Sequence, residues 1–168
     1  MSLLKFLKDA GEKLFGGKEA QAAPAPAADP AAAQARIQEA NAKAAEAIRK
    51  YIASQGLTAD ALEVSFDGAT TTVTVSGVAA DQATKEKIVL CCGNVAGVSE
   101  VNDLLTVAAP PEPESQFHLV AKGDTLSAIA KKFYGNANAY MKIYEANRPM
   151  LSHPDKIYPG QLLRIPPA

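Results

Sequence analysis

The sequence predicts an α+β protein of two small domains, preceded by a short N-terminal helix. Three observations support this fold class. The chain has 168 residues, of which 48% are apolar, enough to give each of two small domains its own hydrophobic core. The spacing of the apolar residues alternates between the helical period and the strand period. A proline-rich linker, residues 108–116, separates an acidic part of the chain from a basic part.

The two parts carry opposite charges. Residues 1–116 hold 10 Lys and Arg against 15 Asp and Glu, a net charge of −5, and residues 117–168 hold 7 against 3, a net charge of +4. We therefore expect two domains that attract each other within a monomer. The whole chain has a net charge of only −1, so a nucleic acid is not an expected partner.

Residues 1–17 predict a short amphipathic helix. Ser2 can cap its start, Gly11 offers a left-handed stop, and the apolar residues recur at helical spacing: Leu3, Leu4, Phe6, Leu7, Ala10 and Leu14. Charged residues interrupt the segment, so it lacks the roughly 7 to 15 uninterrupted apolar residues of an export signal. No segment of the chain approaches the ~20 apolar residues of a membrane span. We expect this helix to dock on the next domain and the protein to be cytoplasmic.

The first domain is predicted to span residues 34–107, after an Ala/Pro-rich linker at residues 18–33. A helix is expected from about Gln34 to Ser54, and its apolar stripe is formed by Ile37, Ala40, Ala44, Ile48, Tyr51 and Ile52. Alternating apolar residues on either side of Asp67-Gly68 predict two strands joined by a turn. A second helix over residues 81–92 and a third strand over 99–107 complete a layer with helices on one face.

The second domain is predicted to span residues 117–168, in the order strand, helix, helix, strand. Residues 117–120 form the first strand, and Thr125 caps a helix with Leu126 and Ile129 on its apolar side. The next helix ends near Asn147, because Pro149 disfavours helical geometry just before it. Residues 162–165 form the last strand.

Cys91 and Cys92 are adjacent and are the only cysteines of the chain. A disulfide between neighbours is strained, so we expect reduced thiols that pack as small apolar groups. No further Cys or His stands near them, which makes a zinc site a poor interpretation. Nor does the chain contain a phosphate-binding Gly loop, a zinc-protease helix or a nucleophile elbow, and we expect that it is not an enzyme.

Several sequence runs resemble known domain families. VSFDG (64–68), VTVSG (73–77), VAGV (95–98) and VND (101–103) look like the BON pattern. GDTLSAIA (123–130), Asn147 and IYPGQLLRIP (157–166) match the LysM pattern. Together with residues 6–14 and 134–138, the whole chain resembles the bacterial potassium-binding proteins that join one BON to one LysM domain. It departs from them in the insertion at 18–33, which lengthens the tether of the first helix.

That resemblance implies a K⁺ site made of backbone carbonyls from Leu7, Ala10, Gly93, Val95 and Val98. The chemistry is reasonable, because K⁺ can be coordinated by neutral carbonyl oxygens and the C-terminus of a helix presents unpaired carbonyls at the negative end of its dipole. Ca²⁺ fits less well, since residues 93–98 contain no carboxylate. The alternative is that Gly93 and Gly97 only end a helix and form a turn. Rejection of Na⁺ depends on dimensions that the sequence does not give.

The LysM resemblance implies a second function, binding of N-acetylglucosamine polymers such as peptidoglycan. The residues in the matching loops are Gly123, Asp124, Thr125, Leu126, Asn147, Arg148 and Ile157. Here too a structural role is the alternative, with Asp124 and Thr125 capping a helix and Ile157 in the core. For a cytoplasmic protein we favour the ion-binding function, with K⁺ as the ligand and an unidentified protein as a further partner.

Overall fold

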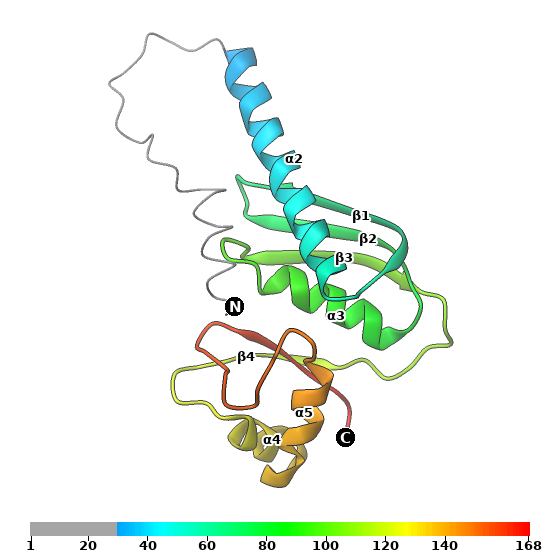
Figure 1. The fold of residues 1–168 in the computed structure, drawn as a ribbon, viewed down its shortest axis with the longest axis vertical. Helices are drawn as coiled ribbons and strands as arrows, with labels where there is room; N and C mark the ends of the chain where they lie inside the picture. The colour runs from blue at the N-terminus through cyan, green and yellow to red at the C-terminus, as the bar shows by residue number, and fades with distance from the viewer. Residues whose placement is uncertain (1–29) are drawn as a thin grey trace.

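The computed structural model describes residues 30–168 (Figure 1). The helix predicted over residues 1–17 and the linker residues 18–29 lie outside the described residues. The first domain consists of α2 (Pro30–Ser54), β1 (Ala59–Asp67), β2 (Thr72–Ala79), α3 (Gln82–Gly93) and β3 (Glu100–Val107). The second consists of β4 (Gln116–Leu119), α4 (Leu126–Tyr134), the 3₁₀ helix η1 (Ala137–Ala139), α5 (Tyr140–Ala146) and β5 (Leu162–Ile165). The predicted α+β class and the order of elements in both domains are confirmed.

The first domain is a three-stranded sheet with both helices on one face (Figure 1). β1 and β2 pair antiparallel through a tight turn, and β3 pairs parallel to β2 because α3 carries the chain back across the sheet. Asp81 caps α3 by accepting a hydrogen bond from the Thr84 amide at 2.6 Å. The core between helices and sheet is centred on Ile52, Val73, Val75, Ile88, Leu90, Cys91 and Cys92, each at most 1% exposed.

The predicted start of α2 is wrong, because the helix begins at Pro30, four residues earlier. Its apolar stripe is buried over only part of its length. Ile37 is 51% exposed and Ala40 is exposed, whereas Ala44, Ile48 and their successors on the stripe are buried. Figure 1 gives the reason, because the first half of α2 extends beyond the edge of the sheet that its second half covers.

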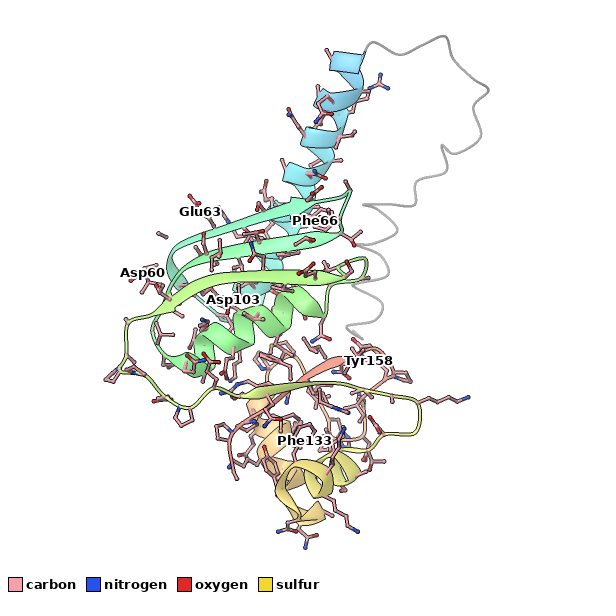
Figure 2. All side chains as sticks on the ribbon, turned by 180° about the vertical axis from the view of Figure 1, so that it is seen from behind. Asp60, Glu63, Phe66, Asp103, Phe133 and Tyr158 are labelled. Atoms are coloured by element: carbon pink, nitrogen blue, oxygen red, sulfur yellow. The ribbon has the colours of Figure 1, made fainter. Side chains whose placement is uncertain are left out.

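A bulge interrupts the pairing of β1 with β2 between Asp60 and Glu63, which are both labelled in Figure 2. Ala61 adopts a φ of 49° there, and Gly77 on the opposite strand adopts a φ of 140°. A Cβ placed on Gly77 would lie 2.8 Å from the Asp60 carbonyl oxygen. Glycine is therefore needed at this position for its conformation and for the close approach of the two backbones.

The second domain packs two helices against one face of the two-stranded β4–β5 sheet. Its core comprises Val120, Leu126, Ile129, Ala130, Ile143, Leu151, Leu163 and Ile165. The Thr125 hydroxyl accepts a hydrogen bond from the Ala128 amide at 3.1 Å, so the predicted cap of α4 is confirmed. α5 ends at Ala146, directly before Asn147, as expected. None of the helices between residues 30 and 168 is both long and apolar enough to cross a membrane.

The two domains are in direct contact through α3, which lies above the second domain in Figure 1. α3 packs against β5, and Met150 from the second domain is part of the core of the first. One face of β5 packs on the core of its own domain, and the other face packs against α3. The helix α3 therefore takes part in the packing of both domains.

Candidate functional site

The segment that follows α3 holds three of the predicted K⁺ ligands, Gly93, Val95 and Val98. It is built from successive turns: the Val95 amide donates to the Cys92 carbonyl at 3.2 Å, and the Val98 amide donates to the Val95 carbonyl at 3.1 Å. Gly97 makes the second turn possible with a φ of 87°. We call residues 93–98 the α3-end segment.

The carbonyl groups of the α3-end segment lie at the negative end of the α3 dipole. Val95 has one of its two lone pairs engaged by the Val98 amide, and no hydrogen bond among residues 30–168 is found to the carbonyls of Gly93 or Val98. Leu7 and Ala10, the other two predicted ligands, lie outside the described residues. Nowhere between residues 30 and 168 do three or more His, Cys, Asp or Glu side chains gather as a metal site would require.

Asn94, inside the α3-end segment, binds the backbone of the second domain. Its Nδ2 donates to the carbonyls of Leu90 and Leu162, both at 3.0 Å, and its Oδ1 accepts from the Leu162 amide at 2.8 Å. Sequence reasoning missed this residue. An asparagine just after a helix indicates a cap, but its contact with a residue 68 positions later is not a local signal.

Gly93 brings the same two parts of the chain into close contact. A Cβ built on Gly93 would lie 2.9 Å from Leu162 Cδ2, which is shorter than real side chains allow. A larger residue at position 93 would therefore require the Leu162 side chain to turn aside, and with glycine the end of α3 lies close to β5. Gly93 is also the last residue of α3, as the structural alternative from the sequence has it.

Glu86 fixes the other end of the contact between the domains. Its Oε2 accepts from Arg164 Nε at 2.6 Å, and its Oε1 accepts from Gln82 Nε2 at 2.8 Å and from the Ser115 amide at 2.7 Å. The side chains of Glu86 and Arg164 are 5% and 11% exposed. Burial raises the pKa of the Glu86 carboxyl, but the hydrogen bonds outweigh it, and the net pKa lies below the ordinary value.

Cys91 and Cys92 are free thiols in the core of the first domain, as the sequence predicted. Burial raises the pKa of each to about 12, with the neighbouring thiol also raising that of Cys91 and the Asp103 carboxylate raising that of Cys92. Both thiols therefore stay protonated in the folded protein and serve as packing groups.

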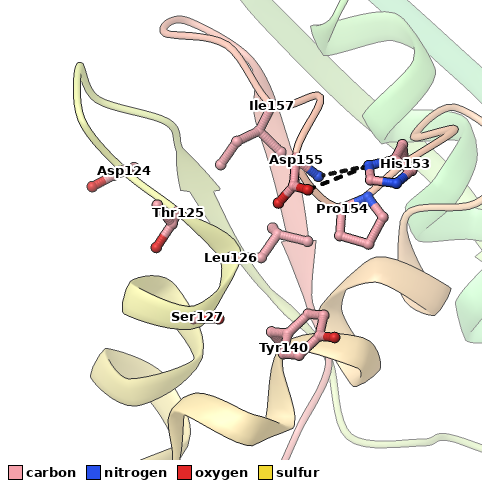
Figure 3. Close-up of a pocket in the computed structure, with 9 residues that line it drawn as sticks. All are labelled: Asp124, Thr125, Leu126, Ser127, Tyr140, His153, Pro154, Asp155 and Ile157. Carbon is pink, nitrogen blue, oxygen red and sulfur yellow. Dashed lines mark hydrogen bonds and ion pairs between the residues drawn. The ribbon is translucent and has the colours of Figure 1, made fainter.

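The second domain contains a pocket of about 610 Å³ between its helices and the loop before β5 (Figure 3). Four of the predicted glycan-binding residues line it: Asp124, Thr125, Leu126 and Ile157. The other lining residues, Ser127, Tyr140, His153, Pro154 and Asp155, were not predicted. His153 and Asp155 lie beside each other in Figure 3, and the Asp155 amide donates to His153 Nδ1 at 3.2 Å.

The remaining predicted glycan residues do not line this pocket. Asn147 is only 1% exposed and is occupied by hydrogen bonds within the domain core. The Arg148 guanidinium lies 6.0 Å from the centre of the Tyr144 ring, and Gly123 is an exposed turn residue with a φ of 92°. The pocket thus brings together four of the seven predicted glycan-binding residues, and the other three lie outside it.

Asp124 lines the pocket and also holds a turn through its hydrogen bonds. Its Oδ2 accepts hydrogen bonds from the Ala121 amide and from His118 Nε2, both at 2.9 Å. The pKa of the Asp124 carboxyl is lowered, first by the Ala121 amide and then by His118. The carboxylate therefore stays ionised at the rim of the pocket, where it stabilises the turn before α4.

Comparisons with known proteins agree with this division into domains. The BON domain model matches residues 40–109, and the LysM domain model matches residues 118–166. The chain is 42% identical over 166 residues to "Potassium binding protein Kbp" of Escherichia coli O6:H1 (strain CFT073), with 99% of each chain covered. It is also 35% identical over 66 residues to "Uncharacterized protein YqbP" of Bacillus subtilis (strain 168), which covers 34% of this chain and 30% of that protein.

A further match is 49% identical over 49 residues to an uncharacterized protein of Deinococcus radiodurans, covering 29% of this chain and 19% of the relative. These partial relatives share only a segment with the chain, whereas the match to Kbp runs from end to end. The matches point to a binding protein rather than an enzyme. The chain, one BON domain followed by one LysM domain, belongs to the family of the potassium binding protein Kbp.

Proposed function

We propose that this protein binds one potassium ion through backbone carbonyl oxygens and acts as a cytoplasmic ion sensor. The proposed ligands are Leu7, Ala10, Gly93, Val95 and Val98. The observation that carries the proposal is the 42% identity, over 99% of both chains, to a protein named for potassium binding. The buried, unpaired thiols Cys91 and Cys92 are compatible with the reducing environment of the cytoplasm.

The chemistry of the α3-end segment supports K⁺ over a divalent ion. The segment contributes carbonyl oxygens at the end of a helix dipole, and its residues carry no carboxylate. A cation of low charge density is bound adequately by such neutral dipoles, whereas Ca²⁺ normally recruits several carboxylates.

Carbonyl nuclear magnetic resonance tests the location of the site. Adding KCl at constant ionic strength should shift the carbonyl ¹³C signals of Gly93, Val95 and Val98 saturably. The carbonyl of Gly160, in an exposed turn of the second domain, serves as the control and should not move. Saturable shifts confined to other residues would place the ion elsewhere, and equal shifts with NaCl would exclude a selective site.

We also propose that ion binding is coupled to the arrangement of the two domains. The support is that the α3-end segment touches β5 directly, through Gly93 and Asn94. A ligand that binds one arrangement better shifts the population toward it. Small-angle scattering in K⁺ and in Na⁺ at matched ionic strength should give a smaller radius of gyration in K⁺. Identical profiles at saturating ion would leave a local site without a change in domain arrangement.

A second candidate function is binding of N-acetylglucosamine polymers by the LysM domain. The pocket of about 610 Å³ favours it, because Leu126, Tyr140 and Ile157 give it apolar surface beside the polar Asp124. Co-sedimentation with insoluble peptidoglycan tests this function, with Tyr140→Ala as the variant. We expect weak or no binding, and strong co-sedimentation lost in the variant would make the glycan function the better one.

A further inference from the structure

Strand β5 has one edge paired with β4 and a second edge that no strand between residues 30 and 168 covers. In an antiparallel pair, alternate residues turn their amide and carbonyl groups away from the partner strand. Leu162 and Arg164 are these residues, since each exchanges its amide and carbonyl hydrogen bonds with a side chain. Side chains therefore satisfy the backbone hydrogen-bonding groups at the free edge of β5.

Two asparagines complete this edge with the same pattern of hydrogen bonds. Asn147, which follows α5, donates Nδ2 to the Arg164 carbonyl and accepts from the Arg164 amide at 2.8 Å. Asn94, which follows α3, does the same for Leu162. Each asparagine also donates to the carbonyl four residues earlier in its own helix, Ile143 or Leu90. Asn147 belongs to the same domain as β5, whereas Asn94 belongs to the first domain.

The position of Asn94 in the chain gives this contact a consequence for the proposed ion site. Asn94 lies between Gly93 and Val95, two of the proposed ligands. The nitrogen and the oxygen of its side-chain amide are both hydrogen-bonded to backbone groups. The carbonyls on either side of it are thereby fixed relative to β5. A glycine and a turn alone would leave that segment more freedom.

We infer that Asn94 is the positioning residue of the ion site. Through Asn94, the free edge of β5 in the LysM domain holds the α3-end segment in its ion-binding conformation. The inference rests on the proposed function and deepens it. The LysM domain would then contribute to K⁺ affinity without supplying a ligand. Because a flexible ring of carbonyls can contract around a smaller ion, the fixed geometry would contribute to discrimination against Na⁺.

The first test replaces the positioning side chain and measures K⁺ and Na⁺ affinity by calorimetry. Asn94→Ala should raise the Kd for K⁺ by about ten-fold, within the range of typical coupling between sites, and reduce the ratio of Na⁺ to K⁺ dissociation constants. Asn102→Ala is the matched control, because Asn102 is exposed on β3 and makes only a 3.4 Å hydrogen bond to Thr74 Oγ1. Unchanged affinity and ion preference in Asn94→Ala would overturn the inference while the proposed function stood.

The second test uses the unmodified protein, so it does not depend on the folding of a variant. Amide hydrogen exchange compares Leu162, held by Asn94 from the BON domain, with Arg164, held by Asn147 from the LysM domain. By linkage, K⁺ should slow exchange at Leu162 about ten-fold more than at Arg164, relative to Na⁺. An equal effect on both amides, or none at Leu162, in a protein that binds K⁺ would refute the role of the β5 edge. Absence of any K⁺ binding would instead refute the proposed function.

Discussion

Glu86 of α3 and Arg164 of β5 form a buried ion pair between the two domains, with 2.6 Å between Glu86 Oε2 and Arg164 Nε. The same carboxylate accepts the amide of Ser115, the last residue before β4. The Glu86 side chain thus connects α3 to the linker and to the second domain. Removing one partner of such a pair leaves the other charge buried without compensation.

Replacing this carboxylate should destabilise the protein. Glu86→Ala leaves the Arg164 guanidinium and the Ser115 amide without their acceptor, and we expect a loss of about 3 kcal/mol in the free energy of unfolding. Urea unfolding measures it, with Glu63→Ala on the exposed side of β1 as the control. A loss no larger than that of the control would show that the pair does not hold the domains together.

The same pair predicts a dependence of stability on acid pH. The pKa of Glu86 is lowered in the folded protein from a value of 4.5, so its contribution is present above pH 4.5 and is lost as the pH falls through the folded-state pKa. Glu86→Gln cannot titrate, and its stability should fall less steeply below pH 4.5. Parallel pH profiles for the two proteins would contradict the assigned pKa direction.

The buried thiols predict slow labelling and a loss of stability at alkaline pH. With the pKa of Cys91 and Cys92 raised to about 12 from 9.0, a disulfide reagent at pH 8 should modify neither thiol in the folded protein and both after unfolding. Because the folded pKa is the higher one, the contribution of the thiols is complete below pH 9 and declines above it. Rapid labelling without denaturant would show that the helix α3 opens readily.

Deleting residues 1–11 should weaken K⁺ binding, because Leu7 and Ala10 are proposed ligands. We expect the Kd for K⁺ to rise at least about ten-fold, since two carbonyls are lost from the ion. The two core clusters that the structure describes consist of residues after position 30, and we expect both domains of the shortened protein to stay folded in Na⁺. Unaltered affinity would remove the N-terminal segment from the site.

Local signals in the sequence were sufficient for the order of the α-helices and strands between residues 30 and 168. Asp81 and Thr125 were predicted as helix caps, and each accepts the expected amide hydrogen bond. The start of α2 was missed because residues 30–33, Pro followed by three alanines, were assigned to the linker on composition. Proline is in fact favourable at the first position of a helix, and alanine is the best helix former.

The contacts between the domains could not be predicted in this way. Glu86 pairs with a residue 78 positions away and Asn94 with one 68 positions away, so neither partner is visible in a local pattern. The opposite net charges predicted attraction between the two parts of the chain, and Glu86 with Arg164 is one specific pair of that kind. For the LysM pocket, the family motif indicated the loops, but Tyr140 and His153 are brought to them only by the fold.

The central claim is that this protein binds potassium selectively. Isothermal titration calorimetry with KCl and with NaCl, at an ionic strength held constant by a large organic cation, tests it most directly. We predict saturable heat with one K⁺ per chain and a much weaker response to Na⁺. Equal responses to the two ions, or no saturable heat with K⁺, would contradict the account.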